Sequence, residues 1–142
     1  MKTLDNDVFA SVQLQTEDLK KLAESGVKTI INNRPDNEEP GQPSSDALAA
    51  AANALGLTYH HIPMAGAIPK NIIEASIAAY KDSPRPIVAF CKSGTRSTAL
   101  WCFAQAGEKD VDGVLKAAAS AGYNLEQLRG GIEAYWAMAT QT

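Results

Sequence analysis

The sequence predicts an α/β protein with a mostly parallel central sheet flanked by helices. Short β-branched and apolar runs alternate along the chain with alanine- and leucine-rich segments of helical length. One run, residues 87–90 (IVAF), is apolar at every position, as is typical of a parallel strand buried on both faces. With 142 residues and 45% hydrophobic content, the chain has the size and composition of one domain, residues 1–142, with a substantial core.

The composition argues against several classes of protein. The net charge is −3 and there is no basic stripe, so we expect no nucleic-acid partner. No run reaches membrane-spanning length, and the N-terminus lacks the apolar segment of a signal peptide. The two cysteines, Cys91 and Cys102, make no disulfide framework, and with two histidines they match no zinc pattern. We expect a cytoplasmic protein with free thiols, no metal, no cofactor and no membrane contact; the sequence predicts no oligomeric state.

The first third of the chain predicts a strand, a helix and a second strand. Residues 8–13 have the composition of a short strand. Thr16 is a suitable N-cap for the following helix, which Gly26 ends. Residues 27–32 (VKTIIN) are a β-branched run of the kind found in buried strands.

The middle of the chain repeats this order. Residues 33–45 are rich in proline and acidic side chains, which predicts a long loop. Ser44 or Ser45 caps the next helix, which runs to Leu55 and is followed by a glycine. Residues 57–63 (LTYHHIP) predict the next strand.

The last part of the chain contains the most apolar strand and several helices. Residues 64–70 predict a loop, residues 71–80 a helix and residues 82–86 a turn. The strand at residues 87–90 follows. Three helices come after it, at residues 97–106, at residues 111–121, and through Ile132 and Tyr135.

The stretch AFCKSGTRSTALW, residues 89–101, indicates chemistry as well as structure. In parallel sheets ligands bind beyond the carboxyl ends of the strands, and Cys91 lies just past such an end. Gly94 permits a tight turn, and the helix that Ser97 opens points unpaired amides and a partial positive charge at the turn. The guanidinium of Arg96 can hold two oxygens of an anion at once. Together these features predict a cup for an oxyanion.

The same surroundings favour an ionised Cys91. A free thiol has a pKa of about 8.5, and a helix N-terminus with nearby cations lowers it to roughly 3.5–7.5. The thiolate is the nucleophilic form, and Ser97 can donate a hydrogen bond to it or help it leave. A plainer interpretation is that Cys91 is a small core residue and that Gly94 and Arg96 form a turn with a surface charge. The combination C-x-x-G-x-R-S between an apolar strand and a helix favours the functional interpretation.

This loop resembles those of two enzyme families. The signature of the cysteine phosphatases is a cysteine, five residues, an arginine, and then Ser or Thr, whereas the rhodanese sulfurtransferases have a loop one residue shorter. Four residues separate Cys91 from Arg96, so loop length alone matches rhodanese. GGIEAYW at residues 130–136, which follows AGY, and HIPMAGA also resemble rhodanese segments.

The order of segments along nearly the whole chain resembles a different family. VQLQTEDLKKLAESGVKTIINNRPDNEE, GLTYHHIPMAG, AFCKSGTRSTALW and AASAGYNLEQLR are similar to the bacterial phosphatase-like domain that also occurs fused to beta-lactamase-like hydrolases. The order of elements differs from that of a rhodanese in two places. A helix and a strand lie between the loops at residues 33–45 and 64–70, and an additional helix lies at residues 111–121. The resemblance implies a dual-specificity phosphatase fold. Members of this family have been labelled both phosphatase and sulfurtransferase.

The resemblance also implies roles for individual residues. Cys91 would be the nucleophile, Arg96 would clamp the substrate oxygens, and Ser97 would assist release of the thiolate. Arg34, just after the strand at residues 27–32, matches a family arginine that braces the site. The amides of the anion-binding loop would come from Lys92, Ser93, Gly94, Thr95 and Arg96.

One expected group is missing. Dual-specificity phosphatases take an acidic aspartate from the loop that corresponds to residues 64–70 (MAGAIPK), and this loop contains none. General acid catalysis contributes about 10²–10⁴-fold, so the absence matters. Asp36, Glu38 and His61 are the replacement candidates. Asp36 also suits a turn, Glu38 could be a solvated loop charge, and His61 could simply be exposed on its strand.

Three functions are compatible with these residues, each with a small anionic substrate. The first is hydrolysis of a phosphomonoester through the Cys91 thiolate. The second is sulfur transfer through a Cys91 persulfide, which the four-residue spacing favours. The third is a non-catalytic anion-binding module, which the missing aspartate favours.

Overall fold

The structure is a computed structural model that describes residues 1–139. The chain forms five strands, β1 (Lys2–Asp5), β2 (Val8–Ser11), β3 (Thr29–Asn32), β4 (Thr58–His61) and β5 (Ile87–Phe90). The α-helices are α1 (Thr16–Glu24), α2 (Ser45–Ala54), α3 (Lys70–Asp82), α4 (Thr95–Phe103), α5 (Val111–Ser120) and α6 (Arg129–Ala139). A short 3₁₀ helix, η1 (Glu126–Leu128), precedes α6.

The strands form one sheet in the order β1-β2-β5-β3-β4, with β5 at its centre. β2, β5, β3 and β4 are parallel, and only β1 runs antiparallel, to β2. In the register of the sheet, Phe90 lies opposite both Ser11 and Asn32, and Asn32 lies opposite His61. The parallel strands therefore end level with one another, and the loops that follow them meet at one edge. The predicted α/β class with a mostly parallel sheet is confirmed.

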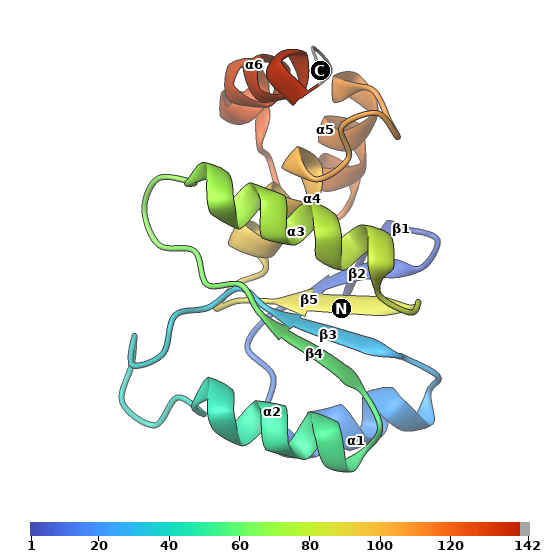
Figure 1. The fold of residues 1–142 in the computed structure, drawn as a ribbon, viewed down its shortest axis with the longest axis vertical. Coiled ribbons are helices and arrows are strands. Elements are labelled where there is room, and N and C mark those ends of the chain that lie inside the picture. The colour runs from blue at the N-terminus through green and yellow to red at the C-terminus, as the bar shows by residue number, and fades with distance from the viewer. Residues whose placement is uncertain (140–142) are drawn as a thin grey trace.

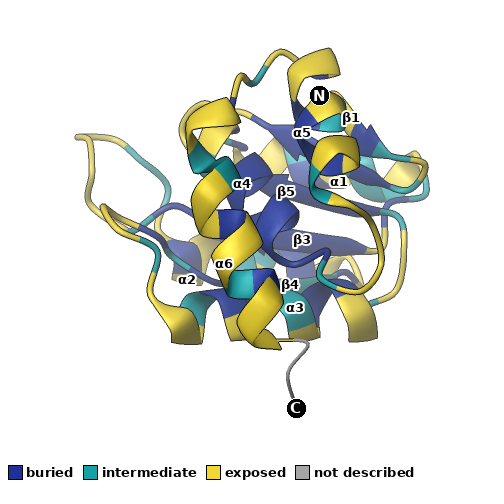
Figure 2. Ribbon diagram, turned by 90° about the horizontal axis from the view of Figure 1, so that it is seen from above, coloured by how far each residue is buried: buried dark blue, intermediate teal, exposed yellow. Residues whose placement is uncertain are grey.

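Helices cover both faces of the sheet (Figure 1). α1 and α2 lie on one face, and α3, α4, α5 and α6 lie on the other. The side chains of β5 alternate between two apolar clusters: Ile87 and Ala89 belong to the cluster with α3–α6, and Val88 and Phe90 to the cluster with α1 and α2. Figure 2 shows the sheet buried between helices whose outer faces are exposed. This explains why residues 87–90 are apolar at every position.

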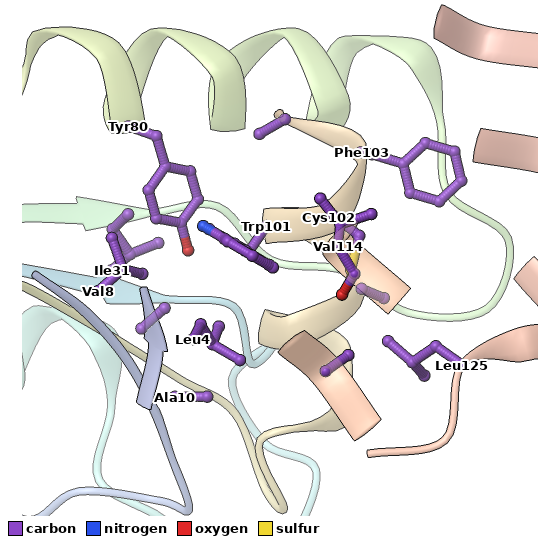
Figure 3. Packing of buried hydrophobic residues seen from close by; sticks show 14 of the residues in the cluster. Leu4, Val8, Ala10, Ile31, Tyr80, Trp101, Cys102, Phe103, Val114 and Leu125 are labelled. Atoms are coloured by element: carbon purple, nitrogen blue, oxygen red, sulfur yellow. The ribbon is translucent and has the colours of Figure 1, made fainter. Parts of the chain in front are cut away.

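Helix α4 is buried along most of its length. Every residue from 97 to 103 is buried, and Trp101, the largest of them, is 1% exposed. Figure 3 shows Trp101, Cys102 and Phe103 among side chains of the sheet, of α3 and of α5. The indole Nε1 of Trp136 on α6 also donates a hydrogen bond to the carbonyl oxygen of Phe103 at 3.1 Å. A helix held on all sides fixes the position of the loop that precedes it.

Several predicted element ends are wrong by one to three residues. The strand predicted at residues 8–13 is β2 and ends at Ser11, and the strand predicted at residues 57–63 is β4 and ends at His61. Gln15, not Thr16, is the N-cap of α1, because Gln15 and Asp18 form a reciprocal capping box. Of the two predicted caps of α2, Ser44 is the one used: its side chain accepts a hydrogen bond from the amide of Ala47.

The start of α4 and the first strand also differ from prediction. The helix begins at Thr95 and ends at Phe103, not at residues 97 and 106, because Gly94 adopts a left-handed conformation and serves as the N-cap. Strand β1 was not predicted, because only Leu4 in KTLD is buried and the strand lies at the sheet edge. Within residues 1–139, none of the helices combines the length and the apolar character needed to cross a membrane.

Candidate active site

Three loops meet at the carboxyl edge of the parallel strands, on one side of the sheet in Figure 1. They follow β5, β3 and β4, and main-chain hydrogen bonds join them. The amide of Asn33 donates to the carbonyl of Phe90 at 2.8 Å, and the amide of Met64 donates to the carbonyl of Asn33 at 3.1 Å. The residues predicted on separate segments, Cys91, Arg34 and Glu38, are thereby brought to one place.

The loop between β5 and α4 wraps its backbone around the sulfur of Cys91. The amide of Gly94 donates a hydrogen bond to Cys91 Sγ at 3.1 Å. Gly94 has a φ of 96°, which is easy only for glycine. The amide and the hydroxyl of Thr98 both donate to the Gly94 carbonyl, at 3.0 and 2.8 Å. These bonds hold the Gly94 carbonyl toward helix α4 and leave the Gly94 amide directed at the sulfur.

The pKa of the Cys91 thiol lies below its ordinary value. Burial by itself raises this pKa, but the donor groups around the sulfur, which are the amides of Ser97, Gly94 and Ser93 and the Ser97 hydroxyl, outweigh burial. The cysteine is 0% exposed. A low pKa in so buried a thiol depends on these donors, because removal from water alone would favour the neutral form.

Ser97 has an unusual hydroxyl. It is 0% exposed, and its Oγ makes no hydrogen bond of standard geometry with any of the described residues. A buried hydroxyl without a partner carries a free-energy cost of about 1–3 kcal/mol. Since this hydroxyl is one of the groups that lower the pKa of Cys91, we place its proton toward the sulfur.

Arg96 lies between two anionic groups. Its guanidinium nitrogens Nη1 and Nη2 each donate to the Glu38 carboxylate at 2.9 Å, and Nη1 also donates to the carbonyl oxygen of Met64 at 2.9 Å. Glu38 raises the pKa of Arg96 most, and the charge of Cys91 raises it further. Glu38 and the Met64 carbonyl therefore fix the guanidinium in place, near enough to Cys91 for the thiolate charge to act on it.

Glu38 and Glu39, which we call the acidic clasp, join three cations around the loop. Arg34 is 3% exposed and donates to Glu38 Oε1 at 2.8 Å and to Glu39 Oε1 at 2.9 Å. Lys92 Nζ lies 2.7 Å from the same oxygen of Glu39. The clasp ties the loop after β3 to the loop after β5, and Arg34 is its buried centre.

The three candidate acids make different contacts. The pKa of Glu38 is lowered to about 2, first by Arg96 and then by Arg34, so at neutral pH it has no proton to donate. One carboxylate oxygen of Asp36 accepts a hydrogen bond from the amide of Ser45, at the start of α2, at 2.8 Å. Nε2 of the exposed His61 lies 2.9 Å from the carbonyl oxygen of Arg34. These contacts make Glu38 a support for Arg96 and leave the proton donor unassigned.

Two residues at the site were not predicted from the sequence. The Tyr123 hydroxyl donates to the carbonyl of Ser93 at 3.1 Å and occupies the space where a Cβ on Gly94 would lie. Burial raises the pKa of Tyr123, and the Cys91 charge raises it further. The Gln13 amide donates to the Lys92 carbonyl at 3.3 Å, and its side-chain oxygen accepts from Arg34 at 2.9 Å. Both lie far from the loop in sequence, in segments that carry the family resemblance, but the sequence assigned neither of them a role at the site.

In the part of the chain that the structure describes, neither Cys102 nor a metal-binding cluster forms a second candidate reactive site. Burial raises the pKa of Cys102 to about 12, and its Sγ faces the carbonyl oxygen of Val114 at 3.8 Å. Among residues 1–139, no three His, Cys, Asp or Glu side chains come close enough together to hold a metal ion.

Residues 1–108 match the phosphatase-like domain of the beta-lactamase hydrolase-like proteins. The chain belongs to this family. Beta-lactamase hydrolase-like proteins of Xylella fastidiosa and Agrobacterium fabrum are 38% and 41% identical to it, over 82% and 63% of its length. The chain spans only 27% and 21% of these relatives, so the phosphatase-like domain is a small part of them.

Solved structures place this phosphatase-like domain in a known fold. A candidate phosphatase from Neisseria meningitidis has a TM-score of 0.80 and 34% identity, with 94% of this chain and 96% of that one covered. The kinase-associated phosphatase KAP has a TM-score of 0.69 at 13% identity, covering 95% and 87%, and so shares the fold. The predicted dual-specificity phosphatase fold is confirmed, and the domain is a phosphatase-like hydrolase.

Proposed function

We propose that this phosphatase-like domain hydrolyses a phosphomonoester through a covalent phosphocysteine on Cys91. The Cys91 thiolate attacks phosphorus, the P–S bond forms as the P–O bond to the leaving group breaks, and water then cleaves the P–S bond to release phosphate. The observation that carries the proposal is a buried sulfur whose pKa is lowered by the amides around it, with Arg96 near enough for the charge of Cys91 to raise the pKa of the guanidinium.

Each site residue has a role in this reaction. The amides of the loop and Arg96 hold the phosphoryl oxygens, since planar guanidinium forks suit such anions. Ser97 donates to the sulfur and eases its departure when the phosphocysteine is hydrolysed. Arg34 and the acidic clasp hold Arg96 and Lys92 in position. We expect a small anionic substrate and a cytoplasmic setting.

The missing aspartate defines the leaving group that the site accepts. The loop at residues 64–70 contains no acidic residue, and Glu38 is ionised. Without a positioned acid, the departing oxygen leaves as its own anion. The reaction should therefore favour esters whose leaving groups have low pKa values, such as aryl phosphates, over simple alkyl phosphates.

The test compares wild type with Cys91→Ser and, as a matched control, Cys102→Ser, using para-nitrophenyl phosphate. We expect turnover in wild type and in Cys102→Ser, and none above background in Cys91→Ser. Equal rates in wild type and Cys91→Ser would contradict the proposal.

A second function is favoured by one specific observation, the four-residue spacing between Cys91 and Arg96. A shorter loop forms a smaller ring of amides, which suits a persulfide better than a phosphoryl group. In this reaction the Cys91 thiolate attacks the outer sulfur of thiosulfate, sulfite leaves, and cyanide removes the sulfur as thiocyanate.

Mass spectrometry separates the two reactions. Sulfur transfer predicts that Cys91 gains the mass of one sulfur atom after treatment with thiosulfate, and that thiocyanate then forms on addition of cyanide. An unchanged mass excludes this second function. Phosphate binding without either turnover would instead support a non-catalytic anion-binding module.

A further inference from the structure

An apolar groove opens directly beside the anion-binding loop. Its volume is about 410 Å³, within the range of roughly 300–1,000 Å³ typical of sites for small molecules. Three segments form its walls: the loop after β4, one side of α4, and η1 with the residue before it. The larger apolar side chains that line it are Met64, Ile68, Phe103, Leu125 and Leu128.

The groove and the anion cup share a wall. Thr95 and Arg96 belong to both, and of the described residues that line the groove only Arg96 is charged. Nη1 of Arg96 donates to the carbonyl oxygen of Met64 at 2.9 Å, which joins the loop after β4 to the cup. The groove thus has its single charge at the end where the phosphoryl group would be held.

The lining determines what the groove can hold. Ile68 and Leu128 are half-buried, whereas Ala99, Phe103 and Leu125 are buried in the core. Few polar side chains line it, so a sugar or a peptide backbone would lose hydrogen bonds with water and find few replacements. An aliphatic chain carries no such cost and gains about 25 cal/mol for each Å² of apolar surface removed from water.

We propose that this groove binds an aliphatic chain carried by the aryl leaving group of the substrate, so that the site takes amphiphilic aryl phosphates. The proposal rests on the proposed function, because it assumes that the anion in the cup is a phosphoryl group. The charged head would be held by the loop amides and Arg96, and the chain would lie along Met64, Ile68 and Leu128.

The experiment measures binding of alkylphosphonates, which cannot be hydrolysed, from methyl to octyl. Dissociation constants come from titration calorimetry, and inhibition of para-nitrophenyl phosphate turnover provides a second measurement. We expect each added methylene to tighten binding by about threefold until the groove is filled, as burial of a methylene predicts.

Two uncharged substitutions in the groove test whether the alkyl chain binds there. Leu128→Gln and Ile68→Gln should weaken octylphosphonate by about tenfold or more and leave methylphosphonate unchanged, since each removes burial of several methylenes. Leu55→Gln is the matched control, because Leu55 is an exposed leucine at the C-cap of α2, across the sheet. Using two variants keeps the test decisive if one of them fails to fold.

The outcomes separate this inference from the proposed function. Equal affinity for methyl- and octylphosphonate, or a chain-length gain that survives in both variants, overturns the groove assignment even if aryl phosphates are turned over. A chain-length gain that is lost in the variants, without turnover of any phosphate ester, supports the groove and contradicts the proposed hydrolysis.

Discussion

Cys91 and Cys102 are both buried thiols, one just before helix α4 and one inside it, and their pKa values shift in opposite directions. Burial raises both. Cys102 faces only the carbonyl oxygen of Val114, which is an acceptor, and its pKa rises to about 12. Cys91 faces amides and a hydroxyl, and its pKa falls. Position at the end of a strand and the start of a helix, not burial, thus lowers the pKa of a thiol.

The same comparison predicts that substitutions near Cys91 and substitutions near Cys102 have different effects. The environment of Cys102 is made of apolar side chains that close-pack around it. The environment of Cys91 is made mostly of backbone donors, whose direction depends on Gly94, Tyr123 and the buried helix α4. Substitutions that turn these donors should make Cys91 more like Cys102.

The largest effect should come from Arg96→Lys, which keeps the charge but removes the planar fork. We expect kcat/KM for para-nitrophenyl phosphate to fall by about 10²–10³-fold, the usual effect of losing one preorganised donor. Arg85→Lys, which changes an exposed arginine paired with Asp7, is the matched control and should be nearly neutral. Undiminished turnover in Arg96→Lys would show that the anion is not held by the guanidinium.

Gly94→Ala should disturb both the loop and the fold. The new Cβ would meet the Tyr123 hydroxyl, and the alanine backbone would have to keep a φ of 96°. The loop must therefore open. We expect a loss of about 1–3 kcal/mol in unfolding free energy and a rise in the pKa of Cys91.

Gly56→Ala separates these two causes. Gly56 also has a positive φ, of 76°, but nothing lies within 4 Å of its added Cβ. It should lose less stability than Gly94→Ala, measured by urea denaturation, and leave the pKa of Cys91 unchanged. Equal effects of the two substitutions would mean that Tyr123 does not constrain the loop.

Ser97→Ala should have a smaller, purely electrostatic effect. It removes the one side-chain hydroxyl that lowers the pKa of Cys91 and leaves the backbone amides in place. We expect this pKa to rise and the pKa of Cys102 to stay the same. If the pKa of Cys91 does not move, the Ser97 proton points elsewhere.

Glu38→Gln should have the smallest effect, and one that depends on pH. Because the pKa of Glu38 is lowered from 4.5 to about 2, its ion pairs stabilise the fold above pH 4.5, and this stability is lost as the pH falls toward 2. We expect the variant to be less stable than wild type by about 1 kcal/mol at neutral pH, because the pair is partly solvated.

Melting temperatures across this pH range check the last prediction. The difference between wild type and Glu38→Gln should shrink as the pH falls below 4.5. Glu24→Gln, at the exposed end of α1, is the control and should show no such trend. A difference that stays constant with pH would contradict the assigned ion pairs.

Much of the fold could be predicted from local sequence patterns. The β-branched and apolar runs, the Ser44 cap and the apolar run at residues 87–90 placed the main strands and helices in order. Strand β1 could not be predicted, because it is polar, lies at the sheet edge and depends on pairing with β2. The start of α4 was misplaced because the left-handed conformation of Gly94 is a property of the folded loop.

Local sequence predicted the part of the candidate site whose residues are close together, and the family resemblance added Arg34. Cys91, Gly94, Arg96 and Ser97 share one motif, and their shared location follows from it. Tyr123 lies on a distant segment and reaches the loop only through the fold. The ion pairs of Glu38 and Glu39 with three cationic side chains could not be predicted from charge alone. Two glutamates in a loop are as easily explained as solvent-exposed charges.

The most direct test of the account is a titration of both cysteines in one folded sample. The Cβ chemical shifts of isotope-labelled cysteine, followed by NMR against pH, report each thiol without requiring a reagent to reach it. The account predicts a midpoint for Cys91 below that of free cysteine and no ionisation of Cys102 until far higher pH. A midpoint for Cys91 at or above that of free cysteine would contradict it.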